Sequence, residues 1–202
     1  GIDLDIFVKK RNSLEIRIKY KIPPNTILIG STGRIVWQKG YDQIISLLNN
    51  FNFSQKQIHF IIAGDGSLKN HYIREIKESG ISDQISFVGN IIDVPEFLLA
   101  LDIYIQPSIT EGFPLSVLEA MATGLPVICS DAGGLKEMIQ HLENGIIYKS
   151  QNINDLYENL CLVLSMTSDR LGHLSKKAIK TVQNKYSINH SAKQYEIIYK
   201  KK

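Results

Sequence analysis

The stretch from residue 111 to residue 127, EGFPLSVLEAMATGLPV, decides how the rest of the chain is interpreted. It begins with Glu111 and a Gly-Phe-Pro turn, continues as an apolar helical pattern and ends where a strand pattern begins. Ser116, Glu119 and Thr123 are three and four residues apart, so they line one face of the predicted helix. Because buried polar side chains need hydrogen-bonding partners, this stretch predicts a helix that contacts something polar.

Outward from this stretch, short apolar runs alternate with helical patterns. The runs are rich in Ile and Val and nearly continuous in apolarity, which is typical of strands covered on both faces. The predicted strands are Ile27–Ser31, Ile58–Ala63, Ile85–Val88, Ile103–Gln106, Val127–Ser130 and, less distinctly, Gly145–Tyr148. The predicted helices are Tyr41–Asn50, Leu68–Ser79, Val94–Leu101, Leu115–Thr123, Leu135–His141, Ile153–Met166, Asp169–Asn184 and Ile188–Tyr199. The alternation predicts an α/β fold, a Rossmann-like parallel sheet of about six strands with helices on both faces.

Length and composition fit one domain with a full core. The chain has 202 residues, 44% of them hydrophobic, and a formal net charge of +3. This mild charge argues against a nucleic-acid partner, which would need a concentrated basic stripe. No apolar run reaches about 18 residues, so no membrane-spanning segment is expected. We predict a connector and domain start over 1–24, the sheet domain over 25–185 and a C-terminal helix over 186–202.

Ligands of such sheets bind outside the carboxyl ends of the strands. The first of these ends carries Gly33-Arg34 and then Lys39-Gly40. Arginine can fork two oxygens and lysine supplies a mobile point charge, so this pair suits a pyrophosphate. Two unrelated surface cations would give the same pattern, but glycines at several other strand ends favour a shared ligand surface.

The two glutamates of the first stretch have separate predicted roles. Glu119 is predicted to bind ribose hydroxyls, and Glu111, on the preceding loop, is predicted to bind a sugar hydroxyl. A capping box of Ser116 with Glu119 is the alternative, although Pro114 favours the first helical position and would place Ser116 inside the helix. For Glu111 the alternative is a solvated loop acid. A hydrolytic acid–base pair is not favoured, because eight helical residues span about 12 Å and glycosidase carboxyls lie about 5–9.5 Å apart.

Together these residues resemble the retaining nucleotide-sugar glycosyltransferases of group 1, also called family four. Nearly the whole chain is similar to the carboxy-terminal, donor-binding half of their GT-B fold. The matching motifs are the segment from Gly33 to Gly40 and the two glutamates separated by seven residues. The resemblance implies three catalytic residues, Arg34, Lys39 and Glu111, with the two cations holding the donor diphosphate. The implied donor-binding residues are Gly33, Gly89, Asn90, Ile91, Gly112, Phe113, Pro114, Leu115, Ser116 and Glu119.

The resemblance also implies what the reaction needs. The donor is expected to be a UDP- or GDP-sugar, and neither a metal ion nor a cofactor is expected. An amino-terminal half with the acceptor site is absent from this sequence, so we expect the chain to bind donor but to transfer sugar poorly. The C-terminal helix is expected to pack partly on that half. The family implies a cytoplasmic enzyme of polysaccharide or glycolipid synthesis, and allows peripheral association with the inner face of the membrane.

Three other interpretations are weighed against this one. A nicotinamide oxidoreductase would carry Gly-x-Gly-x-x-Gly after the first strand, and the sequence there is Gly33-Arg34-Ile35-Val36. A metal-dependent transferase of the other major fold would use a motif such as Asp3-Leu4-Asp5, but this motif precedes the sheet and favours a connector turn. A non-catalytic nucleotide-sugar sensor or assembly module would share the same binding residues, so the sequence leaves it open.

Overall fold

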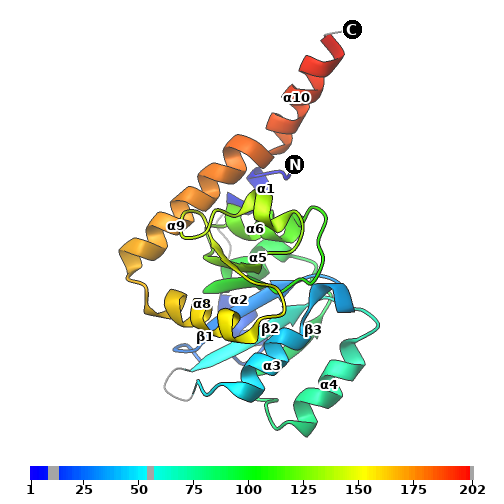
Figure 1. Cartoon of the computed structure of the whole chain (residues 1–202), viewed down its shortest axis with the longest axis vertical. Coiled ribbons are helices and arrows are strands. Elements are labelled where there is room, and N and C mark those ends of the chain that lie inside the picture. Colours follow the sequence, from blue (N-terminus) through cyan, green and yellow to red (C-terminus); the bar gives the residue numbers. More distant parts are fainter. Residues whose placement is uncertain (9–13, 54–56, 201–202) are drawn as a thin grey trace.

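A six-stranded parallel sheet organises the chain in the computed structural model, which describes residues 1–8, 14–53 and 57–200 (Figure 1). The strands lie in the order β3-β2-β1-β4-β5-β6. Their bounds are β1 Ile27–Thr32, β2 Ile58–Ala63, β3 Ile85–Gly89, β4 Ile103–Gln106, β5 Val127–Ser130 and β6 Ile146–Tyr148. The predicted fold class is therefore confirmed, and each predicted strand end lies within about one residue of the observed one.

The helices connect these strands and cover the sheet. Their bounds are α1 Asp5–Val8, α2 Leu14–Lys19, α3 Asp42–Asn50, α4 Lys69–Glu78, α5 Val94–Leu99, α6 Leu115–Ala122, α7 Leu135–Met138, α8 Ile153–Ser165, α9 Ser168–Thr181 and α10 Ile188–Lys200. A single 3-10 turn, η1, spans Trp37–Lys39, and a π-helical turn, η2, spans Val182–Tyr186.

Two predicted helices end about three residues early, more than the usual uncertainty of a helix boundary. The helix predicted over Leu135–His141 ends at Met138, because the buried Asn144 side chain bonds the Met138 carbonyl and the Gln140 amide and so holds the chain in a turn. The helix predicted over Asp169–Asn184 ends at Thr181 and gives way to the π turn. The helices α1 and α2 were not predicted, since both are too short to show a helical pattern and α2 is rich in charged residues.

Alternate strand residues face two separate hydrophobic layers. Ile29, Phe60 and Ile105 pack in one layer with α3, α4 and α8. Leu28 and Tyr104 point the other way, into a layer formed with α1, α2, α5, α6, α7 and α9. This explains why the strand sequences are nearly continuously apolar, as strands covered on both faces must be. The described part of the predicted 1–24 segment contributes to the second layer, so it packs as part of this domain, and its role as a connector stays a prediction.

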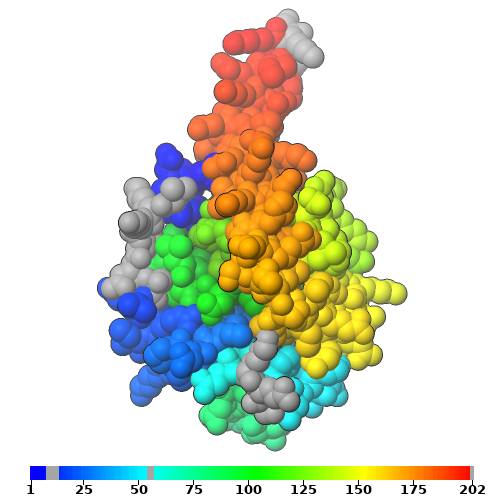
Figure 2. Space-filling model, turned by 90° about the vertical axis from the view of Figure 1, so that its left-hand side faces the viewer, coloured from blue at the N-terminus to red at the C-terminus, as the bar shows by residue number. Residues whose placement is uncertain are grey.

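The last helix, α10, leaves the body of the domain (Figures 1 and 2). None of its described residues is buried, and Tyr195 and Ile198 are 63% and 58% exposed. The amino-terminal segment lies at its base, where the Ile2 amide donates to the Tyr186 carbonyl at 2.9 Å. Packing of α10 on another domain therefore stays a prediction, and residues 201–202 of that predicted segment lie outside the described residues. None of the helices in the described ranges has the length and apolarity needed to cross a bilayer.

The loops after β1 and β2 touch through a glycine. Gly64, directly after β2, has φ +143°, and a Cβ at this position would overlap the Gly33 carbonyl. The Gly33 amide in turn donates to the Ala63 carbonyl at 3.0 Å. A side chain at position 64 would therefore push apart two loops that both lie at the carboxyl edge of the sheet.

We expect Gly64→Ala to lower the free energy of unfolding by about 2 kcal/mol or more, because the new methyl group adds backbone strain to a steric overlap. Gly172→Ala in α9 is the matched control, since nothing lies within contact of a Cβ there. That control should gain about 0.5–1 kcal/mol from helix propensity. Urea denaturation measures both, and a Gly64→Ala variant as stable as the parent would contradict the contact.

Candidate functional site

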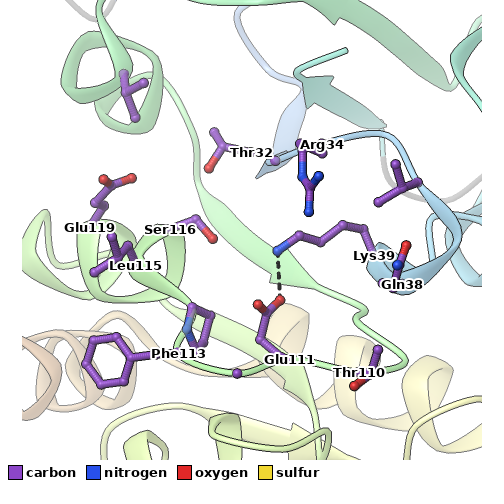
Figure 3. Close-up of a pocket in the computed structure, with 15 residues that line it drawn as sticks. Thr32, Arg34, Gln38, Lys39, Thr110, Glu111, Phe113, Leu115, Ser116 and Glu119 are labelled. Carbon is purple, nitrogen blue, oxygen red and sulfur yellow. Dashed lines mark hydrogen bonds and ion pairs between the residues drawn. The ribbon is translucent and has the colours of Figure 1, made fainter. Parts of the chain in front are cut away.

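The main pocket lies where the strand order reverses, between β1 and β4. The loops after these strands and the start of α6 enclose about 560 Å³ there (Figure 3). A second pocket of about 280 Å³ adjoins it and shares Thr32, Gly33, Arg34 and Val94 with it. In open α/β sheets this reversal point is where ligands bind. The two connected pockets therefore form the candidate site.

The structure brings together nearly all of the residues predicted from sequence. The larger pocket is lined by the predicted residues Gly33, Arg34, Lys39, Glu111, Gly112, Phe113, Pro114, Leu115, Ser116 and Glu119. The smaller pocket is lined by Asn90 and Ile91. Gly89 lines neither pocket, because its carbonyl accepts the Gly64 amide at 2.8 Å and the residue supports the strand end instead.

Lys39 and Glu111, predicted to bind different parts of a ligand, are paired with each other. Lys39 Nζ lies 2.7 Å from Glu111 Oε2, and the two side chains are only 16% and 13% exposed. Figure 3 shows them pointing toward each other across the pocket, with Arg34 close by. Within the described part of the chain, the exposed Arg34 guanidinium has no ion-pair partner. Arg34 is therefore the uncompensated cation of this pocket.

Glu119 faces the same pocket from α6 without a partner. Its partly buried carboxylate accepts no hydrogen bond from the described residues, and burial raises the pKa of this carboxyl. The capping-box alternative does not form, since α6 begins at Leu115 and Ser116 lies inside it, donating to Gln106 Oε1 at 3.3 Å. Pro114 precedes the helix instead of occupying its first position. The carboxylate is thus available to accept hydrogen bonds from a ligand.

The loop that carries Glu111 is held from several sides. The Ile109 amide donates to the Gln38 carbonyl at 2.8 Å, which ties this loop to η1. The buried Gln43 side chain donates to the Pro107 carbonyl at 2.5 Å. A Cβ at Gly133 or Gly134 would overlap the backbone of the same loop, so only glycines let the loop after β5 pack against it. The loop is therefore a fixed support for Glu111.

Sequence reasoning missed the polar residues beneath this loop. Tyr104, Gln106 and Ser108 are fully buried and hydrogen-bonded in series. Their spacing of two residues in an otherwise apolar strand was the available signal, since it places all three on one face. Thr32, Gln38 and Thr110 also line the larger pocket without having been predicted.

The acidic motif near the amino terminus forms a local turn. The Asp3 carboxylate accepts the backbone amide of Asp5 at 3.0 Å, just before α1. Among the described residues, no group of three or more His, Cys, Asp or Glu side chains is arranged to hold a metal ion. The motif therefore forms a local turn before α1, and its place between two domains stays a prediction.

Comparisons with known proteins agree on one family. The profile of the family described as glycosyl transferases group 1 matches residues 12–181. The O-antigen biosynthesis glycosyltransferase WclY of Escherichia coli is 30% identical over 200 residues, covering 98% of this chain and 53% of WclY. The lipopolysaccharide core biosynthesis mannosyltransferase LpsB of Rhizobium meliloti is 25% identical and is covered to 58%. The chain thus spans about half the length of the curated relatives it matches.

Solved structures show the same fold. The C-terminal domain of the group 1 glycosyltransferase LpcC from Francisella tularensis aligns with a TM-score of 0.79 at 28% identity, covering 93% of this chain and all of that domain. Anabaena HepE, solved in complex with UDP, aligns with a TM-score of 0.87 at 20% identity, covering 99% of this chain and 56% of HepE. The expected fold, a Rossmann-like half of a GT-B glycosyltransferase, is confirmed, and the chain belongs to the group 1 glycosyltransferase family.

Proposed function

We propose that this chain is the donor-binding half of a retaining glycosyltransferase, which moves a sugar from a nucleoside-diphosphate sugar to a carbohydrate or lipid-linked acceptor. One observation carries the proposal most directly. The Arg34 cation and the Glu119 carboxylate, which have no partner in the described part of the chain, open into one pocket at the strand reversal. A diphosphate needs a cation and a ribose needs a hydrogen-bond acceptor, so a nucleoside diphosphate satisfies both groups at once.

The pocket has a place for each part of such a donor. The diphosphate would lie against Arg34 and Lys39, near the N-terminal amides of α6, which favour anions. The ribose would reach Glu119, one turn further into that helix. The base would extend into the smaller pocket beside Asn90 and Ile91. HepE, a neighbour with the same fold, binds UDP, which supports a uridine nucleotide among the donor candidates.

The Lys39–Glu111 ion pair suggests that both residues exchange partners when the donor binds. A bound diphosphate would attract Lys39, and Glu111 would accept a hydrogen bond from a sugar hydroxyl in exchange. As the bond to the sugar breaks, negative charge grows on the departing diphosphate, and Arg34 with Lys39 would stabilise it. The acceptor would attack from the same face, which retains the configuration at the anomeric carbon.

A second domain would complete the cleft. Exposed apolar side chains gather at the pocket rim, where Phe113 and Leu115 are 52% and 48% exposed, and along α10. Phe113 also contacts Tyr186 at the base of α10, with ring centroids 6.0 Å apart. An acceptor-binding half packed on this side would cover both regions. The isolated chain should therefore bind donor and show at most trace transfer.

Nucleotide binding is testable on this chain alone. UDP or GDP, at a hundredfold excess over its dissociation constant, should stabilise the chain by roughly 2.7 kcal/mol, while NAD should not. Arg34→Ala should weaken nucleotide binding about tenfold or more, since it removes a charge-assisted contact. Thermal shift and calorimetry measure these effects.

Arg74→Ala is the matched control, because Arg74 is an exposed arginine on α4, away from both pockets. It should bind nucleotide as the parent does. Equal binding by the Arg34→Ala variant, or stabilisation by NAD as large as by UDP and GDP, would contradict the proposal.

Glu119 gives a second test through pH. Burial raises its pKa in the folded state, so the ionised form destabilises the ligand-free protein above that pKa, and the penalty disappears as pH falls below the unfolded-state value. Glu119→Gln should therefore raise the free energy of unfolding at pH 7 by about 0.5–2 kcal/mol, with a smaller gain near pH 4. The same variant should bind UDP or GDP more weakly.

Glu158→Gln is the control, because Glu158 is an exposed glutamate on α8. Its stability should follow that of the parent at both pH values in urea denaturation. A Glu119→Gln variant that is less stable at pH 7 and unchanged in nucleotide affinity would show that Glu119 serves the fold and not a ligand.

A further inference from the structure

A chain of buried hydrogen bonds runs beneath the pocket and ends at Glu111. We call this set, Thr32, Tyr104, Gln106, Ser108 and Glu111, the polar relay. Thr32 Oγ1 lies 3.1 Å from Tyr104 Oη, which donates to Gln106 Oε1 at 3.0 Å. Gln106 Nε2 donates to Ser108 Oγ at 2.8 Å, and Ser108 Oγ donates to Glu111 Oε2 at 2.9 Å. The relay thus links the buried face of the sheet to an acid of the site.

The hydrogen bonds of the relay from Gln106 to Glu111 have a fixed direction. Since Ser108 Oγ accepts from the Gln106 amide, its single hydrogen is free to point at the Glu111 carboxylate. Glu111 Oε2 then accepts from both Ser108 and Lys39. Among the described residues, Glu111 Oε1 has no such partner. One oxygen is anchored and the other is left for a ligand.

The side-chain amide of Gln106 also contacts α6, the helix that carries Glu119. Gln106 Oε1 accepts from Ser116 Oγ, in the first turn of α6, at 3.3 Å. Gln106 therefore touches both sides of the pocket, through Ser108 toward Glu111 and through Ser116 toward α6. Tyr104, Gln106 and Ser108 are all fully buried. Burying polar side chains costs free energy unless each one is hydrogen-bonded, so apolar residues would be sufficient if these positions served packing alone.

We propose that Ser108 and Gln106 are positioning residues, which hold the Glu111 carboxylate in the orientation that accepts a hydrogen bond from the donor sugar. The inference rests on the proposed function, since it takes Glu111 as the acid that binds a sugar hydroxyl. Neither residue touches the donor. Removing either should therefore weaken recognition of the sugar and leave recognition of the nucleotide nearly intact.

The experiment compares two affinities on the same protein. Calorimetry with a panel of UDP- and GDP-sugars identifies the sugar nucleotide whose affinity most exceeds that of its nucleoside diphosphate. Ser108→Ala should reduce that affinity about tenfold, as expected for one lost hydrogen bond to a charged group, and change the nucleoside diphosphate affinity less than about twofold. A purely structural role would weaken both ligands together, which would overturn the proposal.

Ser31→Ala is the matched control, because Ser31 is a fully buried serine of β1 that lines neither pocket and takes no part in the polar relay. It should leave both affinities unchanged. If Ser108→Ala does not fold, Gln106→Met takes its place, since it breaks the relay one bond earlier while keeping a side chain of similar length. It should show the same selective loss, and equal losses for both ligands would overturn the proposal.

Glu111→Gln separates this inference from the proposed function. If that variant loses the preference for the sugar nucleotide and Ser108→Ala keeps it, Glu111 binds the sugar without help and the positioning role is refuted. If Glu111→Gln keeps the preference, the sugar-binding role of Glu111 fails, and the positioning role fails with it. If neither the uridine nor the guanosine nucleotides of the panel bind the parent chain, the proposed function itself fails.

Discussion

The parallel pairing of β1 with β4 is the constraint on which the site depends. Ile29 lies opposite Ile103 and Gly30 opposite Tyr104, although β2 and β3 intervene in the sequence. Because the chain builds one half of the sheet outward and then returns to the centre, the loops after β1 and β4 end side by side. Arg34 and Lys39 come from the first loop, and Glu111 with the start of α6 comes from the second. A strand order that separated β1 from β4 would separate the cations from the acids.

Two kinds of charged group then meet in this crevice. Lys39 and Glu111 compensate each other and join the two loops, with Ser108 supporting the carboxylate from below. Arg34 is exposed and Glu119 partly buried, and neither has a charged or hydrogen-bonding side-chain partner among the residues that the structure describes. Charged groups without a partner in a pocket lower the free energy of unfolding unless a ligand binds to them. Such a loss of folding stability is common at binding sites. The paired groups therefore join the two loops of the site, and in the proposed function the unpaired groups would contribute to its affinity for the donor.

Much of this was predictable from sequence because it depends on local pattern. Ile- and Val-rich runs located every strand, and the glycine and glutamate motifs located Arg34 and Glu119 on one pocket. The Lys39–Glu111 pair was not predictable, since 72 residues separate the partners and only the fold makes them neighbours. The early end of α7 depends on the Asn144 side chain, which the helical pattern does not reveal. Gly89 lines neither pocket, and a glycine at a strand end can serve a backbone turn as readily as a ligand, so its predicted role stays a prediction.

The most direct test of this account is a crystal structure of the chain with a nucleoside-diphosphate sugar. The account predicts the diphosphate within hydrogen-bonding distance of Arg34, the pentose hydroxyls on Glu119 and the base beside Ile91. A nucleotide bound elsewhere, for example in the groove beside Arg17 at the opposite edge of the sheet, with Arg34 and Glu119 both untouched, would contradict it.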